Sequence, residues 1–202
     1  MFEPFGTIRV AMMKGLIRSC NPEHKIVVDL GAGNPAISDG IDCSRRIKLD
    51  INPASNPDYV CDLTKGIPLE DSSVDICVAS EILEHIYTSK KLLDDIRRIL
   101  KPGGNLILSS PNICSLKYRI AFMMGRIPAH AAKADCFYKV DKPGHIRDYN
   151  FDEMISLLRG QGFETVWSGT DGLSFRSKTF LPSKLLPKTF GDAIIIKARK
   201  RG

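Results

Sequence analysis

The chain has 202 residues and a formal net charge of +6, and 43% of its residues are hydrophobic. This length and apolar content predict one domain spanning residues 1–202 with a real core, and they exclude disorder along the whole chain. Lys and Arg are scattered, with a dense run only at 197–201. Because no recognition motif accompanies the charge, specific nucleic-acid binding is not expected, whereas a membrane contact of the basic tail stays open.

The six cysteines form no C-x-x-C pair, so no cysteine zinc site is predicted. Charged residues interrupt the first 20 positions, and no apolar stretch is long enough to cross a bilayer. These features predict reduced thiols and a cytoplasmic location, and they indicate no oligomeric state.

Apolar residues recur at helical spacing near the N-terminus, at Ile8, Met12, Leu16 and Ile17. With basic residues between them, they predict an amphipathic helix within residues 5–20. Such a helix could cover a substrate or lie on a membrane surface. Packing against the rest of the domain is the favoured interpretation.

Short apolar runs then alternate with more polar segments. The segments after Pro35, at 81–87 and at 89–100 are predicted to be helical. Strand alternating with helix is typical of a mostly parallel sheet covered on both faces. The predicted strands of this part lie at 25–30, 46–50, 58–61, 74–79 and 105–109.

The alternation stops after Pro111. Residues 112–149 are too long for a plain connection and contain a possible helix at 116–124. We interpret this insertion as a cover over an acceptor site, with an ordinary packed helix as the alternative. Asn150 is a good helix N-cap. The last predicted elements are a helix and two strands, at 151–160, 163–168 and 193–198.

A glycine motif follows the first predicted strand, Asp29-Leu-Gly31-Ala32-Gly33. Its glycines let the backbone turn tightly and approach a ligand, but NAD-binding folds use the same pattern. Asp29 is the distinguishing residue, because an acid there can orient loop amides or meet a ligand ammonium. Asp50 ends the next strand, where a carboxylate can accept two hydrogen bonds from a ribose diol. Together these residues favour a nucleoside ligand.

Further motifs come in a fixed order after Asp50: Asp62-Leu63, Pro68-Leu-x-Asp-x-Ser-Val-Asp75, Ser80-Glu-Ile-Leu-Glu-His85 and Leu100-Lys-Pro-Gly-Gly104. With the glycine motif, they make residues 25–110 resemble class I S-adenosylmethionine-dependent methyltransferases of the type-11 group. The resemblance implies a Rossmann-like three-layer α/β sandwich. Its seven-stranded, mostly parallel sheet would have the order 3-2-1-4-5-7-6, with the last strand antiparallel.

The same resemblance implies S-adenosyl-L-methionine as cofactor. Gly31 and Gly33 would line its methionine end, Asp50 would hold the ribose hydroxyls and Asp62 would accept from the adenine amino group. Ala79, Ser80 and Glu81, at the end of the fourth strand, would border the methyl-transfer point. The whole implied cofactor-binding set is Asp29, Gly31, Ala32, Gly33, Asp50, Ile51, Asp62, Leu63, Ser80 and Glu81.

Two histidines are candidate catalytic residues. His85 follows Glu81 by four positions, so the predicted helix would place both on one face. His85 could be a base at the methyl site, or it could only fix local structure. His145, with Arg147 and Tyr149, follows the insertion and could line an acceptor pocket or close over the sheet. No metal ligand set is predicted.

We therefore expect an enzyme that transfers a methyl group to a small-molecule, lipid or sugar-like acceptor. The chain lacks the Asn/Asp-Pro-Pro-aromatic run and the Pro-Cys nucleophile of enzymes that methylate DNA bases. One alternative is a non-catalytic module of the same fold that binds the cofactor or a partner. An NAD(P)-dependent oxidoreductase is the other, but it does not account for Asp29 and Asp62 together.

Overall fold

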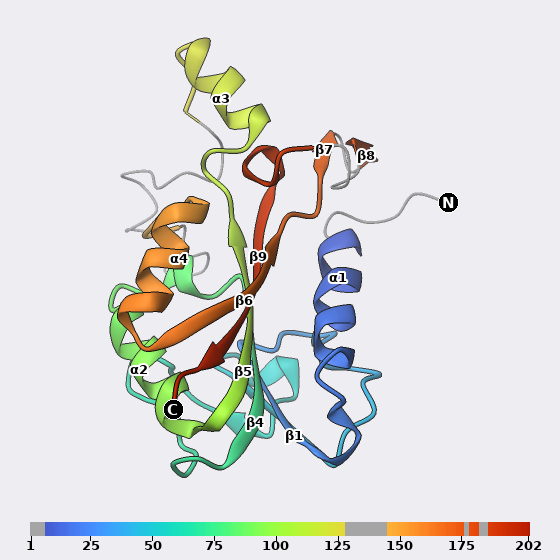
Figure 1. The fold of residues 1–202 in the computed structure, drawn as a ribbon, viewed down its shortest axis with the longest axis vertical. Helices are drawn as coiled ribbons and strands as arrows, with labels where there is room; N and C mark the ends of the chain where they lie inside the picture. Colours follow the sequence, from blue (N-terminus) through green and yellow to red (C-terminus); the bar gives the residue numbers. More distant parts are fainter. Residues whose placement is uncertain (1–6, 128–144, 176–177, 182–185) are drawn as a thin grey trace.

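A seven-stranded sheet forms the centre of the protein, with strand order β3-β2-β1-β4-β5-β9-β6 (Figure 1). The computed structural model describes residues 7–127, 145–175, 178–181 and 186–202. Within the sheet, β9 alone runs antiparallel to its neighbours, which confirms the predicted Rossmann-like order. The strands are β1 (Ile26–Leu30), β2 (Arg45–Asp50), β3 (Tyr59–Val60), β4 (Val74–Ser80), β5 (Leu100–Pro111), β6 (Phe163–Gly169) and β9 (Ala193–Lys200).

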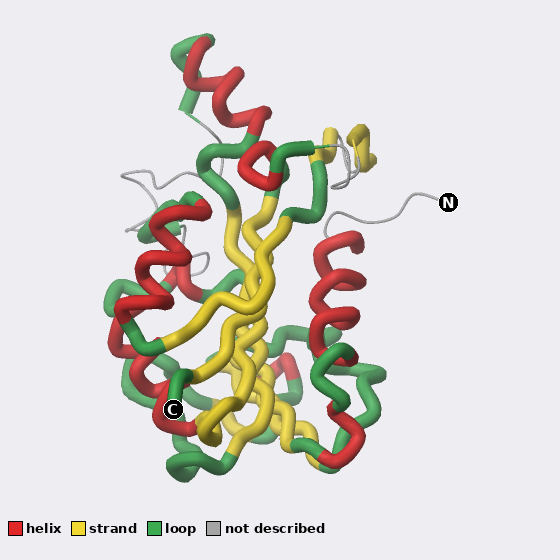
Figure 2. Tube along the Cα trace, viewed as in Figure 1, coloured by secondary structure: helices red, strands yellow, loops and turns green. Residues whose placement is uncertain are grey.

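Helices cover both faces of this sheet (Figure 2). The α-helices are α1 (Thr7–Arg18), α2 (Ser89–Ile99), α3 (Leu116–Met123) and α4 (Phe151–Gly160). Helix α1 lies on one face, whereas α2 and α4 lie on the other (Figure 1). Single 3-10 turns occur at η1 (Pro22–His24), η2 (Pro53–Ser55), η3 (Leu83–His85) and η6 (Lys188–Phe190). The chain also forms a separate hairpin that was not predicted, β7 (Leu173–Phe175) with β8 (Lys178–Leu181).

Helix α1 buries an apolar stripe against the sheet, in agreement with the packed-helix interpretation. Met13 and Ile17 are fully buried, while Met12 and Leu16 pack at the edge of the same cluster. Burial of this stripe is the main force that holds the helix in place. Among the described residues, no helix is long and apolar enough to cross a membrane. The sheet residues of this cluster are Val27, Ile76, Val78, Ile107, Ala193 and Ile195.

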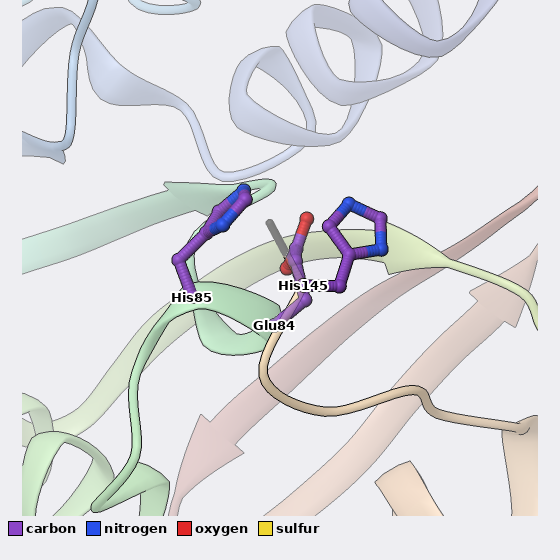
Figure 3. Close-up of side chains that lie close together, drawn as sticks. All are labelled: Glu84, His85 and His145. Carbon is purple, nitrogen blue, oxygen red and sulfur yellow. The ribbon is translucent and has the colours of Figure 1, made fainter. Parts of the chain in front are cut away.

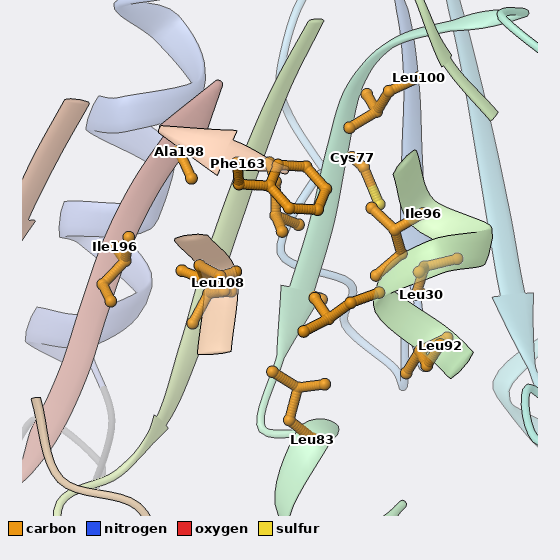
Figure 4. Close-up of a cluster of buried hydrophobic side chains, with 14 of the residues drawn as sticks. Leu30, Cys77, Leu83, Leu92, Ile96, Leu100, Leu108, Phe163, Ile196 and Ala198 are labelled. Carbon is orange, nitrogen blue, oxygen red and sulfur yellow. The ribbon is translucent and has the colours of Figure 1, made fainter. Parts of the chain in front are cut away.

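The opposite face of the sheet carries the larger core (Figure 4). Alternate strand residues point to this face because the side-chain period of a strand is two. Leu108 of β5 and Ile196 of β9 are paired across the two strands and both belong to this core. Phe163, the first residue of β6, is buried in the same cluster. Helix α2 adds residues at helical spacing, so both layers interdigitate. The buried apolar residues of this helix are Leu92, Leu93, Ile96 and Ile99.

A capping box starts α4 at the predicted N-cap. Asn150 Oδ1 accepts from the Glu153 amide (2.9 Å), and the Glu153 carboxylate accepts from the Asn150 amide (3.4 Å). We expect Asn150→Ala to lower the free energy of unfolding by about 1 kcal/mol, and Asn150→Ser to preserve most of it. Urea denaturation of the three proteins checks this. An equal loss in both variants would show that the cap contributes nothing.

The helix predicted after Pro35 is absent, and that prediction is wrong. Residues 31–44 form turns and bends instead. Two aspartates satisfy backbone amides there: Asp29 Oδ2 accepts from the Ser38 amide (2.8 Å), and Asp39 Oδ2 accepts from the Ala36 amide (2.9 Å). Short acidic side chains compete with helical hydrogen bonds in this way.

The prediction of a helix at 81–87 is also wrong, because only the 3-10 turn η3 forms there. Glu81 has a left-handed backbone (φ 56°), and Ile86 is extended. The Glu84 carbonyl accepts from the Ile146 and Arg147 amides (2.8 and 3.2 Å), so it is not available to continue a helix. Glu81 and His85 therefore do not share a helix face.

Part of the predicted insertion 112–149 is described. Helix α3 ends one residue before the predicted 116–124, and it projects from one end of the sheet (Figure 1). Residues 128–144 lie outside the described residues, so the interpretation of the insertion as an acceptor cover stays a prediction. The same holds for the assignment of 1–202 to a single domain.

Candidate functional site

Three parallel strands end at the same edge of the sheet and bring the predicted site together. Strands β1, β2 and β4 end at Leu30, Asp50 and Ser80. The chain runs outward from β1 through β2 to β3 and then returns to β4 on the other side of β1. Ligands of open α/β sheets bind at such a reversal, beyond the carboxyl ends of the strands.

The glycine loop and Asp50 are in direct contact. Asp50 Oδ2 accepts from the Gly33 amide (2.8 Å), and Oδ1 accepts from the Asn52 amide (2.8 Å). The Ala32 amide donates to the Leu49 carbonyl (3.0 Å), which fixes the loop against β2. The carboxylate that was predicted to hold a ribose therefore also shapes the loop.

Both loop glycines have left-handed backbone conformations, with φ 58° at Gly31 and 59° at Gly33. A Cβ at Gly31 would lie 2.0 Å from Ile82 Cδ1, whereas a Cβ at Gly33 would meet nothing within 4 Å. A larger residue at Gly31 would have to displace the end of the Ile82 side chain, and the left-handed backbone at this position itself favours glycine. The backbone at Gly33 faces open space and can be approached by a ligand.

Asp29 lies beneath this loop and is only 1% exposed. Burial raises its pKa from 3.8 to about 6, against the opposing effect of the hydrogen bond from the Ser38 amide. The carboxyl group thus orders the loop that follows the glycines, as one of the two sequence interpretations expected. Its contact with a ligand ammonium stays a prediction.

Asp62 and Leu63 follow β3, next to Asp50. The Cys61 amide donates to the Asp50 carbonyl (2.9 Å), so the segment continues from the same edge. The Thr64 hydroxyl and amide both donate to Asp62 Oδ1 (2.7 and 2.9 Å), and they hold the pKa of Asp62 below its usual value. Leu63 is buried, while Ile51 is 67% exposed at the end of β2.

Ser80 and Glu81 contact Ser109 of β5, and Glu81 also contacts Arg9 of α1. Neither Ser109 nor Arg9 was among the predicted site residues. Ser109 Oγ lies 3.0 Å from Ser80 Oγ and donates to Glu81 Oε1 (3.0 Å). Arg9 of α1 pairs with Glu81 Oε2 (3.0 Å). Burial raises the pKa of Glu81, and the Arg9 guanidinium opposes that shift. Arg9 was not predicted because only the packing of α1 brings it to this edge.

The two candidate catalytic histidines lie together, with Glu84 between them in the view of Figure 3. The rings of His85 and His145 are edge to face, with centroids 5.2 Å apart. Glu84 is 1% exposed, and its Oε2 accepts from Ser110 Oγ (3.2 Å). Burial first, and then the charge of Glu81, raise the pKa of Glu84 to about 8. Glu84 was not among the predicted site residues, although it directly precedes His85.

A groove of about 660 Å³ lies between the start of α2 and the start of α4. Its wall includes Tyr149, whose hydroxyl lies 2.8 Å from Ser89 Oγ. None of the predicted cofactor-binding residues lines this groove. Its lining residues are Tyr87, Thr88, Ser89, Lys90, Lys91, Arg147, Asp148, Tyr149, Glu153 and Leu157.

A sheet of this order, with a glycine loop bonded to a strand-end carboxylate at its reversal point, is the architecture of class I S-adenosylmethionine-dependent methyltransferases. Comparison with protein families agrees. Residues 8–123, more than half of the chain, match the family model described as "Hypothetical methyltransferase". The chain therefore belongs to this methyltransferase family, which confirms the resemblance to class I S-adenosylmethionine-dependent methyltransferases.

Individual relatives are consistent with this assignment. A probable S-adenosylmethionine-dependent methyltransferase of Mycolicibacterium smegmatis is 33% identical over 99 residues, which are 48% of this chain and 32% of that protein. The chain thus spans about a third of the length of the curated relatives it matches.

Two solved structures share the fold. A possible histamine N-methyltransferase of Thermotoga maritima superposes with a TM-score of 0.66 at 17% identity, over 95% of this chain and 89% of that one. The second is 1,6-didemethyltoxoflavin-N1-methyltransferase of Burkholderia thailandensis, solved with bound 1,6-didemethyltoxoflavin and S-adenosylhomocysteine. This structure superposes with a TM-score of 0.66 at 15% identity, over 98% of this chain and 80% of that one.

Proposed function

We propose that this chain is an S-adenosylmethionine-dependent methyltransferase with a small-molecule, lipid or sugar-like acceptor. The observation that carries the proposal is the link between Asp50 and the Gly33 amide at the reversal of strand order. It joins a backbone that a ligand can approach to a carboxylate, at the position where open α/β sheets generally bind ligands. Membership of a methyltransferase family supports the same conclusion.

Two features of this edge support binding of the cofactor. The open space at Gly33 leaves room for close approach of a ligand. Each Asp50 oxygen accepts one backbone amide, and a carboxylate oxygen can accept a further hydrogen bond, so a ribose diol can be held there. Beyond Asp50, the Leu63 amide and the Asp62 carboxylate are the candidate partners of the adenine.

When bound, S-adenosylmethionine supplies a methyl group already activated on a positively charged sulfur. The protein then has to position the acceptor in line with that methyl group and exclude competing reactions. Ser80 and Glu81 border the proposed transfer point, where Ser109 and Arg9 fix the Glu81 carboxylate. His85 and His145 are candidates for taking a proton from an acceptor that arrives protonated.

A titration followed by a turnover assay tests the proposal. We expect S-adenosylhomocysteine to bind in calorimetry and to raise the melting temperature, whereas NAD(H) does neither. Incubation of the protein with S-adenosylmethionine and a panel of hydroxyl, amine and sugar acceptors should then release S-adenosylhomocysteine.

The outcomes separate the alternatives. Binding of NAD(H) without binding of S-adenosylhomocysteine would indicate an oxidoreductase. Tight cofactor binding with no turnover across the whole panel would indicate a non-catalytic module of the same fold.

A further inference from the structure

Glu84, His85 and His145 converge on one point from two separate segments (Figure 3). Glu84 and His85 come from η3, directly beyond β4, and His145 precedes α4. Each residue offers one potential ligand atom, and the three atoms all lie within 4.8 Å of one another. One carboxylate oxygen and two imidazole nitrogens at this spacing can reach a single metal ion.

An oxygen of the buried Glu84 side chain is an independent indication that this cluster can bind a cation. Glu84 is 1% exposed, and its Oε2 accepts from Ser110 Oγ. Its Oε1 is buried and has no hydrogen-bond partner among the described residues. A buried carboxylate oxygen without a partner is costly, and a bound cation would offset that cost.

The surrounding residues hold this cluster in place. The Glu84 carbonyl accepts from the Ile146 amide (2.8 Å), which ties η3 to the segment that carries His145. Asp148 Oδ1 lies 3.7 Å from His145 Nδ1. At this distance the carboxylate acts on the imidazole through its charge rather than through a hydrogen bond. Carboxylates next to ligating imidazoles are part of many metal sites.

We propose that Glu84, His85 and His145 form a binding site for a divalent first-row transition metal ion of the Zn²⁺ or Co²⁺ type. Two imidazole nitrogens favour such ions over Mg²⁺ and Ca²⁺, which prefer oxygen ligands. Three protein ligands also leave at least one coordination position open for water or a substrate oxygen.

A metal at this place would narrow the acceptor class, a step that rests on the proposed function. The cluster begins three residues after Glu81, which borders the proposed transfer point. An open coordination position there would orient an acceptor that carries a hydroxyl or carboxylate oxygen. Both histidines would then act as ligands, so their proposed role as bases would be excluded.

Titration of Co²⁺ into the full chain, without cofactor or acceptor, tests the site. We expect one Co²⁺ per chain, with visible absorption bands that report nitrogen coordination and a rise in melting temperature. His85→Ala, His145→Ala and Glu84→Gln should each weaken binding about 100-fold, since even residues behind the ligands contribute about 10- to 100-fold. His24→Ala is the matched control, because His24 is an exposed histidine in η1 outside the cluster.

Asp148→Asn keeps all three ligands and provides a milder variant if a ligand variant does not fold. It should weaken Co²⁺ binding about 10-fold or more. Absence of saturable Co²⁺ binding to the unmodified chain would overturn the proposal, as would binding that survives in the folded ligand variants. Co²⁺ binding without S-adenosylhomocysteine binding would instead contradict only the methyltransferase proposal.

Discussion

Asp50→Asn is expected to weaken binding of S-adenosylhomocysteine about 100-fold. The carboxylate would make two charge-assisted hydrogen bonds to the ribose diol, and their loss corresponds to about 3 kcal/mol. Asparagine keeps the size of the side chain and one acceptor oxygen, so it disturbs the Gly33 and Asn52 amides less than alanine would. Isothermal titration calorimetry of both proteins measures the change directly.

Asp58→Asn is the matched control for this experiment. Like Asp50, Asp58 accepts from a backbone amide, in this case that of Lys48 in β2 (2.7 Å), but it does so at an exposed position. It should alter stability slightly and leave the affinity unchanged. If Asp50→Asn binds as tightly as the unmodified chain, the nucleoside does not lie at the end of β2, and the proposed function loses its main support.

Asp29→Asn is expected to stabilise the cofactor-free protein at neutral pH by up to about 3 kcal/mol, because burial disfavours the charged carboxylate and raises its pKa from 3.8 to about 6. The folded pKa of Asp29 is about 6 and the reference value is 3.8. The folded state therefore binds the proton more tightly, and the contribution of Asp29 to stability is complete below pH 4. It is lost as the pH rises through 6 and is constant above about 7.

Urea denaturation of both proteins between pH 4.5 and 8 checks this sign. The advantage of the variant should grow across the lower half of this range and then level off. We also expect the variant to bind S-adenosylhomocysteine more weakly, since a negative charge close to the ammonium is lost. A stability difference between the two proteins that is independent of pH would contradict this prediction. It would show that other interactions compensate the cost of burying the charged Asp29 carboxylate.

Much of this architecture could be predicted because its signals are local. The apolar runs that became β1, β2 and β4 are bounded by glycine or acidic residues, and parallel strands place their ends at one edge. Asp50 and Gly33 were expected at one ligand site, and the structure joins them by a hydrogen bond. The contacts of the other cofactor-binding residues with a ligand stay predictions.

The two wrong helix predictions and the failure to predict a role for Glu84 have a common cause, because tertiary contacts override local propensity at these positions. The Glu84 carbonyl is used by the backbone after His145, so residues 81–87 cannot form the predicted helix. Side chains of Asp29 and Asp39 replace the helix expected after Pro35. Glu84 was overlooked because its burial depends on the packing of η3 against β5, which no sequence period reveals.

The ion pair between Arg9 and Glu81 ties the first helix to the candidate site. A residue near one end of the chain sets the charge balance at a turn that lies some seventy positions away. Helix α1 is therefore not an interchangeable cover. A chimera that borrows this helix from a relative would have to bring a cation at the same position, or else redesign the acidic turn beyond β4.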